Sequence, residues 1–258
     1  MILKQMHDWL IRLGDLLTIR KSFSSWSEFL NMRRTYQETF CFNFWDYWYS
    51  SEKFGRWKQD KPYIVYQEKR NTLLDDALFM ETWGGGTTMY AHYDEQSEKE
   101  MYFNFSAAAI ESKFKIGYGY TEVKFTCNQT NGMHICPLWL WAEDETGSYE
   151  IDGMEIYFNE GKPFWATTAF HWWLPSGHSQ KTQKHRLEDP FCPYINNVVG
   201  IERTEDRVRW WWNNKLVRQL HVKTPRKSVI KINTGVQHRE ADGHGFMQIN
   251  EISHYEAI

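Results

Sequence analysis

Residues 147–158 read "GSYEIDGMEIYF", a strand-like run that carries three acidic side chains, Glu150, Asp152 and Glu155. In a regular strand alternate side chains share a face, so Glu150 and Asp152 point the same way. The next position on that face is Met154, yet the third acid stands one residue later. A β-bulge that adds one residue at Gly153 brings Glu155 back to the face of the other two acids. The spacing therefore predicts a bulged strand with three carboxylates on one surface.

Neighbouring carboxylates repel one another, and burial raises their pKa values further, so a fold keeps such a cluster mainly where chemistry uses it. Glycoside hydrolysis uses two carboxyls on one surface, one as nucleophile and the other as proton donor. A third carboxyl between them can hydrogen-bond the nucleophile and couple the protonation states of the set. Two alternatives remain open at this point: a solvated strand face, and a calcium site built from the same oxygens.

From about residue 60 onwards the chain consists of short alternating runs separated by turn residues, such as "PYIVYQEK" (62–69), "YTEVKFTC" (120–127) and "SVIKINTG" (228–235). Many short strands with little helix predict an all-β sandwich or jelly roll. The run "RWWWNNKLVRQ" (209–219) predicts a hairpin, because Asn213 and Asn214 tolerate the positive φ of a two-residue turn.

The first 40 residues have a different pattern, and we expect them to form a helical extension, residues 1–40, ahead of a β-domain, residues 41–258. Apolar residues recur at helical spacing over residues 2–19, and Ser25 to Glu28 fit a capping box for a second short helix. Such a pair of helices packs on its own domain or docks onto a partner protein; the sequence leaves both alternatives open.

Composition narrows the classes of partner. The 258 residues carry a net charge of -3, without the basic excess that nucleic-acid binding needs, so we expect no nucleic-acid partner. No run approaches the roughly 18 consecutive apolar residues of a membrane span, and we recognise no secretory signal. The 14 tryptophans exceed what we expect for core packing, and their broad faces suit stacking on sugar rings. Cys127 and Cys136 either form a disulfide across a short hairpin or stay buried free thiols.

Several segments, taken in order, resemble glycoside hydrolase family 16. The resemblance covers roughly residues 60–258, and the ordered set is more specific than any single motif. Its motifs are "EIDGME" (150–155) as the bulged family signature, "SKFKIGYGYTE" (112–122), "PLWLWAED" (137–144), "FHWW" (170–173), "DRVRWWWNNKLVR" (206–218) and "MQINEISHYEA" (247–257).

The resemblance implies a concanavalin-like β-jelly-roll and a retaining endo-β-glycosidase. By it, Glu150 is the nucleophile, Asp152 its assisting carboxylate and Glu155 the general acid/base. The bulged signature favours the branches that act on β-1,3-glucan (laminarinase) or on agar, porphyran or carrageenan (agarase and related enzymes). We expect action outside the cell and no cofactor; a structural calcium ion on the convex face would suit the resemblance, but no ligands for it can be named.

The side chains expected to hold the polysaccharide are aromatic. Trp139 and Trp141 share one face of the strand before the acids and are the first candidates for sugar stacking, with core packing as the alternative. His171 matches the downstream histidine of the family. Trp172 and Trp173 point to opposite faces, so at most one of them should face the substrate, and we name Trp173.

Two features depart from the family pattern: Glu202 stands where the family usually has tryptophan, and Gly153 replaces a commoner aliphatic residue. A flexible bulge could misplace Glu155, and small displacements cost rate heavily. Two other functions therefore remain open. The first alternative to the glycosidase is a glycan-binding, lectin-like jelly roll without activity. The second is a structural component of a larger assembly such as a virus particle.

Overall fold

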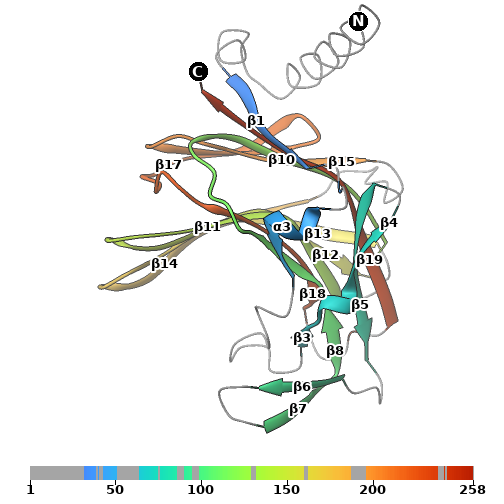
Figure 1. The fold of residues 1–258 in the computed structure, drawn as a ribbon. Coiled ribbons are helices and arrows are strands. Elements are labelled where there is room, and N and C mark those ends of the chain that lie inside the picture. The colour runs from blue at the N-terminus through green and yellow to red at the C-terminus, as the bar shows by residue number, and fades with distance from the viewer. Residues whose placement is uncertain are drawn as a thin grey trace, which may run out of the picture.

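The computed structural model describes residues 32–38, 40, 43–50, 64–74, 76–85, 90–94, 99–128, 132–159, 162–186, 196–237, 241 and 243–257. Over these residues the chain is a sandwich of two large sheets, seen as stacked layers in Figure 1. The all-β class expected from the alternating runs is confirmed. The described helices are short, the α-helix α3 (Phe44–Tyr47) and the 3-10 helix η2 (Glu68–Arg70). None of the described helices is long and apolar enough to cross a membrane.

The larger sheet has ten strands. Along its hydrogen-bonded path they follow the order β17 (Lys215–His221), β16 (Arg207–Trp212), β15 (Asn197–Arg203), β10 (Gly119–Asn128), β19 (Gly243–Ala257), β5 (Ala77–Gly84), β8 (Phe105–Ala107) and β3 (Ile64–Tyr66). Off this path, β1 (Met32–Glu38) pairs with β19, and β4 (Asn71–Leu74) pairs with β5. The last strand of the chain, β19, thus lies in the middle of the sheet and contacts β10, β5 and β1.

The smaller sheet has seven strands. Their order is β14 (Gly177–His185), β13 (Lys162–Leu174), β12 (Gly147–Asn159), β11 (Met133–Asp144), β18 (Val229–Val236), β9 (Ala109–Ser112) and β2 (Trp48–Tyr49). A separate hairpin joins β6 (Tyr90–Asp94) to β7 (Lys99–Phe103) and lies at the bottom of Figure 1. The acidic run of the sequence is therefore the central part of β12, with β11 and β13 on either side.

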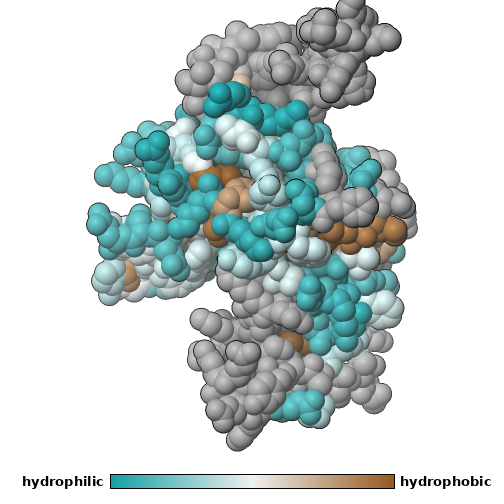
Figure 2. Space-filling view, viewed as in Figure 1, coloured by the Kyte–Doolittle hydropathy of each residue, from teal (hydrophilic) through white to brown (hydrophobic). Residues whose placement is uncertain are grey.

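The core fills the space between the two sheets. Period-two alternation sends Val123 and Phe125 of β10 inward from one sheet, and Leu138 and Leu140 of β11 inward from the other. All four side chains are at most 2% exposed. Burial of such side chains contributes roughly 1.5–3 kcal/mol each, which makes the interface between the sheets the main source of stability. On the face shown in Figure 2, hydrophilic residues cover most of the described surface.

The hairpin predicted at "RWWWNNKLVRQ" is confirmed. β16 and β17 pair antiparallel and end at Trp212 opposite Lys215. The two turn residues adopt φ values of 46° at Asn213 and 66° at Asn214. Asparagine tolerates this left-handed region better than most residues, so the local sequence sets the turn.

One expectation needs correction. Residues 32–38, placed in the helical extension, form β1 in the larger sheet, so the β-domain includes residues before 41. Of the two alternatives left open for Cys127 and Cys136, buried free thiols are confirmed, because β10 and β11 belong to different sheets and form no hairpin. The helices expected within residues 1–31 lie outside the described residues and stay predictions.

Candidate active site

The bulge predicted in the acidic strand is confirmed by the pairing of β12 with β13. Glu150 lies opposite His171 and Asp152 opposite Ala169, whereas Glu155 lies opposite Thr167. Three steps along β12 from Asp152 to Glu155 thus match two steps along β13, which is the signature of one extra residue. β11 keeps its register with β12 through this region, and itself shifts against β18 between Cys136 and Trp139. The two neighbouring strands bend together at the acids.

Glycine is required in the bulge for a steric reason. A Cβ at Gly153 would lie 2.5 Å from the Leu138 carbonyl oxygen and 3.1 Å from Val199 Cγ2. Real Cβ atoms do not approach backbone that closely, so a larger residue would push β12 away from β11. Among the described glycines with positive φ, Gly153 does not appear. Close approach, rather than the unusual backbone angles that the sequence suggested, explains the glycine.

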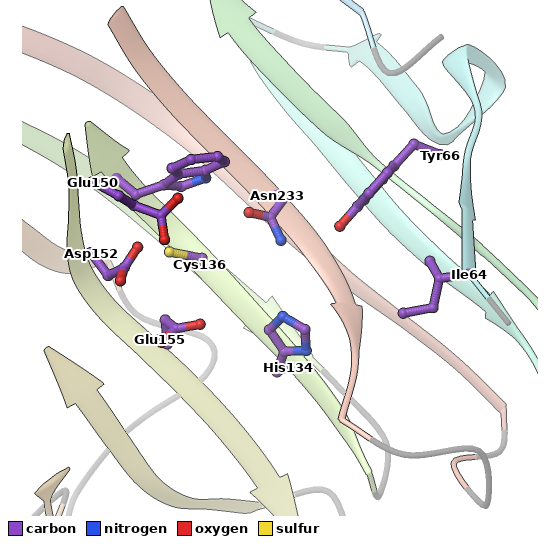
Figure 3. A pocket seen from close by; sticks show the side chains of 9 residues that line it. Ile64, Tyr66, His134, Cys136, Glu150, Asp152, Glu155 and Asn233 are labelled. Atoms are coloured by element: carbon purple, nitrogen blue, oxygen red, sulfur yellow. The ribbon is translucent and has the colours of Figure 1, made fainter. Parts of the chain in front are cut away.

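All three acids line one pocket (Figure 3). The other lining residues come from both sheets: Ile64, Tyr66, His134, Cys136, Trp139 and Asn233. Asp152 is buried, while Glu150 and Glu155 are partly exposed. The acids therefore do not form the solvated strand face that the spacing alone left open.

Burial and mutual repulsion make this cluster retain protons. Burial first, and the neighbouring Asp152 second, raise the pKa of Glu150 to about 8, while His171 and Lys231 act in the opposite direction. Burial and the Glu155 carboxylate raise the pKa of Asp152 well above its ordinary value. A cluster of this kind holds at least one proton at neutral pH, which is the condition for general-acid catalysis there.

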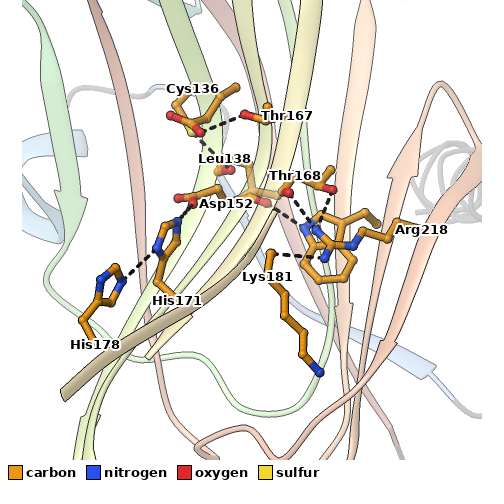
Figure 4. A network of polar contacts seen from close by, with 11 residues as sticks. Cys136, Leu138, Asp152, Thr167, Thr168, His171, His178, Lys181 and Arg218 are labelled. Atoms are coloured by element: carbon orange, nitrogen blue, oxygen red, sulfur yellow. Dashed lines mark hydrogen bonds and ion pairs between the residues drawn. The ribbon is translucent and has the colours of Figure 1, made fainter. Parts of the chain in front are cut away.

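Hydrogen bonds from β13 orient the acids (Figure 4). Thr167 Oγ1 donates to Glu155 Oε2 over 3.0 Å, so the neighbouring strand fixes one oxygen of that carboxyl. His171 Nε2 lies 3.3 Å from Asp152 Oδ2. On its other side, His171 Nδ1 lies 3.2 Å from Nε2 of His178, an exposed residue of β14. A chain of polar contacts thus runs from the buried Asp152 to the surface.

The aromatic candidates lie near the acids in different ways. Trp139 lines the pocket, and its buried indole nitrogen finds no hydrogen-bond partner in the described part of the chain. Trp141 lies opposite Glu150 in the ladder, and its ring centroid is 5.4 Å from that of Trp173. Trp173 stacks on His178 at 4.7 Å, whereas Trp172 packs against the core. Of the pair at 172–173, Trp173 is therefore the residue on the side of the acids, next to His171.

Several residues of the site were not found from the sequence. Lys231 of β18 places its ammonium 4.7 Å from the Trp139 ring and 5.4 Å from the Trp141 ring, and forms a 2.9 Å ion pair with Glu111. Thr167 and His178 join the site through cross-strand pairing. Register in an antiparallel ladder places such neighbours, and one sequence fixes that register only where a turn or a bulge is recognised.

One set of side chains could hold a cation. Ligand atoms of Glu150, Asp152 and His171 lie within 4.8 Å of one another, in the described part of the chain. Two of the three are the acids of the pocket, so a bound ion would occupy the position that the glycosidase hypothesis gives to a sugar. The calcium site that the resemblance would suit on the convex face stays a prediction.

Comparison with known proteins identifies solved structures that share the fold. No family model and no curated protein matches the sequence. Among solved structures, the laminarinase catalytic domain from Thermotoga maritima MSB8 is 15% identical with a TM-score of 0.69, and the match covers 88% of this chain and 99% of that one. The kappa-carrageenase from Pseudoalteromonas carrageenovora is 12% identical with a TM-score of 0.68, covering 88% and 96%.

A third structure, SCLam, is described as a non-specific endo-beta-1,3(4)-glucanase from family GH16. It is 15% identical with a TM-score of 0.70, and the match covers 88% of this chain and 92% of that one. Identities this low show a shared architecture, here over most of each chain. The jelly roll that the sequence motifs imply is thereby confirmed, and the protein has the fold of the family 16 glycoside hydrolases.

Proposed function

We propose that the protein is a retaining endo-β-glycosidase that cleaves a polysaccharide by double displacement. The observation that carries the proposal is the meeting of Glu150, Asp152 and Glu155 in one pocket through a bulge in β12. The fold shared with glucanases and a carrageenase supports it. A two-carboxyl mechanism with retention needs the nucleophile and the acid about 5–5.5 Å apart, and two acids on one face of a bulged strand suit that spacing.

In the first step, the Glu150 carboxylate attacks the anomeric carbon in those enzyme molecules in which it has released the proton that its raised pKa of about 8 otherwise retains at neutral pH, while Glu155 donates its proton to the departing glycosidic oxygen. The bond from Thr167 leaves the second oxygen of Glu155 to carry the proton. Asp152, whose pKa is raised by burial and by Glu155, keeps its proton and donates a hydrogen bond to Glu150. That donated hydrogen bond favours the ionised form of the nucleophile, as does the positive charge of Lys231.

In the second step, water replaces the leaving sugar next to Glu155, which is now deprotonated. Glu155 takes a proton from this water, the oxygen attacks the anomeric carbon, and Glu150 leaves as a carboxylate. The two inversions give net retention. All proton transfers in this scheme use the carboxyls of β12, so the enzyme returns to its starting protonation state.

The substrate that we propose is a β-1,3-glucan or a galactan of the agar, porphyran or carrageenan type, cleaved within the chain. Trp139, Trp141 and Trp173 offer aromatic surface beside the acids for sugar rings. The enzyme would act outside the cell, as the resemblance to family 16 implies. Neither the laminarin-type nor the galactan-type substrate is favoured over the other by the described residues.

The test is digestion of a panel that contains laminarin, mixed-linkage glucan, agarose, porphyran, κ-carrageenan and mucin O-glycans. We include mucin because one further solved structure of this fold comes from work on endo-acting O-glycanases of gut bacteria, and has a TM-score of 0.70. Release of oligosaccharides with initial retention of the anomeric configuration supports the proposal. Glu150→Gln should abolish release while binding persists.

Two other outcomes favour the rival functions. If the wild-type protein binds one of these polysaccharides tightly and releases nothing from any of them, the lectin-like function gains. If it neither binds nor cleaves, and captures a protein partner only while residues 1–30 are present, the assembly function gains. The matched control for Glu150→Gln, in both the release assay and the binding assay, is Glu145→Gln, which changes an exposed acid in the turn before β12.

A further inference from the structure

A tryptophan from the opposite sheet forms a hydrogen bond to the bulge from the core side of β12. Trp210 lies on β16 in the ten-stranded sheet, is fully buried, and donates from Nε1 to the backbone oxygen of Asp152 over 2.6 Å. This bond crosses the core from one sheet to the other. Asp152 is the last residue before Gly153, so the bond ends where the register shift begins.

The direction of this bond explains why the bulge needs it. Carbonyl groups of a regular ladder lie in the plane of the sheet and bond to neighbouring strands. Trp210 approaches from the core, so the Asp152 carbonyl has turned out of that plane. An extra residue leaves ladder groups unpaired, and a buried carbonyl without a donor is costly. The indole N–H supplies a donor to this carbonyl at the position where the register with β13 shifts.

The same peptide is confined from the other directions. The Leu138 carbonyl of β11 and the side chain of Val199 on β15 leave no room for a Cβ at Gly153. The bulge is therefore bonded on its Asp152 side and closely packed on its Gly153 side. A backbone held in this way determines in which direction Glu155, two residues further on, leaves the strand.

Arg218 fixes the indole in turn. Its guanidinium carbon lies 4.7 Å from the centre of the Trp210 ring. Nη1 donates to the backbone oxygen of Thr168 over 2.7 Å and to its Oγ1 over 3.0 Å, and Nη2 donates to the Lys181 oxygen over 3.1 Å (Figure 4). Arg218 belongs to β17, whereas Thr168 and Lys181 belong to β13 and β14. The indole is thus tied to the strand whose Thr167 binds Glu155.

The geometry points to Trp210 as a positioning residue: its indole N–H, braced by Arg218, sets the bulge at Asp152 and so aims Glu155 at the leaving oxygen. The statement rests on the proposed glycosidase function. Trp210 does not touch the substrate, because it lies in the core on the far side of β12 from the pocket. Its effect passes through the backbone of Asp152 and Gly153.

The test removes the donor and keeps the shape. One variant carries 3-benzothienylalanine at position 210, which replaces the indole N–H by sulfur in a ring of nearly the same size. The second is Trp210→Phe. The control is Trp212→Phe, two residues along the same strand, where the ring packs at 6.1 Å from Phe125. All proteins are first checked for native circular dichroism and cooperative unfolding.

For kinetics, each protein is compared on the polysaccharide and on an aryl oligoglycoside with a good leaving group. Protonation by Glu155 matters for the polysaccharide and hardly at all for the activated aryl compound. We expect kcat on the polysaccharide to fall about 100-fold in both Trp210 variants, with KM nearly unchanged, because misplacement of about 1 Å costs this much. The value of kcat/KM on the aryl substrate reports the first step alone, which needs no acid there and does not include the second step in which Glu155 acts as base, so it should fall by no more than about threefold. A merely structural role would lower both rates together, and that result overturns the inference.

A crystal structure of the benzothienylalanine variant supplies a readout that needs no activity. We expect the Asp152 carbonyl to turn back towards the ladder and the Glu155 carboxyl to move. An unchanged bulge and an unchanged Glu155 overturn the inference, whatever the enzyme does. If the wild-type protein cleaves none of the substrates, the proposed function fails, while the structural comparison still decides whether Trp210 sets the bulge.

Discussion

Glu150 should make the folded protein less stable as the pH rises, and its neutral analogue should remove this effect. The pKa of Glu150 is raised from 4.5 to about 8, chiefly by burial and then by Asp152. Below the ordinary pKa the carboxyl is protonated in both the folded and the unfolded states, and costs nothing. Between the two values the unfolded chain releases the proton that the folded protein retains, so stability is lost as the pH rises through this window.

The magnitude follows from the two pKa values. At pH 7 the retained proton corresponds to a loss of about 3 kcal/mol in the free energy of unfolding, against about 1 kcal/mol at pH 5. Glu150→Gln cannot ionise and escapes this loss. We therefore expect the difference in the free energy of unfolding between the variant and the wild-type protein to rise by about 2 kcal/mol, in favour of the variant, from pH 5 to pH 7. A constant offset from the amide itself cancels in that difference.

Urea unfolding at pH 5, 6, 7 and 8 measures this, with the fluorescence of the 14 tryptophans as the signal. Glu145→Gln serves as the control, because this exposed acid in the turn before β12 should track the wild-type protein at every pH. A gap between Glu150→Gln and wild type that stays constant from pH 5 to pH 8 would refute the reasoning. Confirmation would identify a site that sacrifices stability for function, as catalytic clusters commonly do.

Three further predictions concern single side chains. Because His171 lowers the pKa of Glu150, His171→Gln should raise it, and the acid limb of the pH profile of kcat/KM should move to higher pH. An unmoved limb would contradict the effect of His171 on the pKa of Glu150. Thr167→Val removes the hydroxyl that orients Glu155, and should lower kcat on the polysaccharide about tenfold, measured against an unchanged melting temperature. Asn214→Gly should raise the free energy of unfolding by about 0.5 kcal/mol, and the melting temperature with it, because glycine adopts the observed φ of 66° without strain. A lower melting temperature in calorimetry would count against the turn assignment.

The local features of the site could be read from the sequence, because each depends on residues close together in the chain. The interval of three between Asp152 and Glu155 predicted the bulge, and the pairing with β13 confirms it. Asn213 and Asn214 likewise predicted the turn, and their positive φ values confirm it. Alternation was enough to predict a sandwich, because period two puts apolar residues on one face of each strand.

The long-range features could not be read in this way. Trp210 and Asp152 are 58 residues apart, and nothing in either segment indicates that they meet. Cys127 and Cys136 are close in sequence, which left a disulfide between them open, yet the chain passes from one sheet to the other between them. The reason for glycine at position 153 is the approach of Leu138 and Val199, which only the packed structure shows. Strand order between sheets, rather than local preference, decides all three.

The central position of β19 has a consequence for how the chain is made. This strand joins β10 to β5 and also pairs with β1, yet it follows all the other described strands in sequence. While the protein is being synthesised, the described strands of this sheet are divided into three unconnected parts, the β10 side, the β5 side and β1, until residues 243–257 have left the ribosome. The edges of these parts are templates for wrong pairing, and contacts this distant in sequence form slowly. Chaperone capture of nascent chains should therefore persist until β19 has left the ribosome.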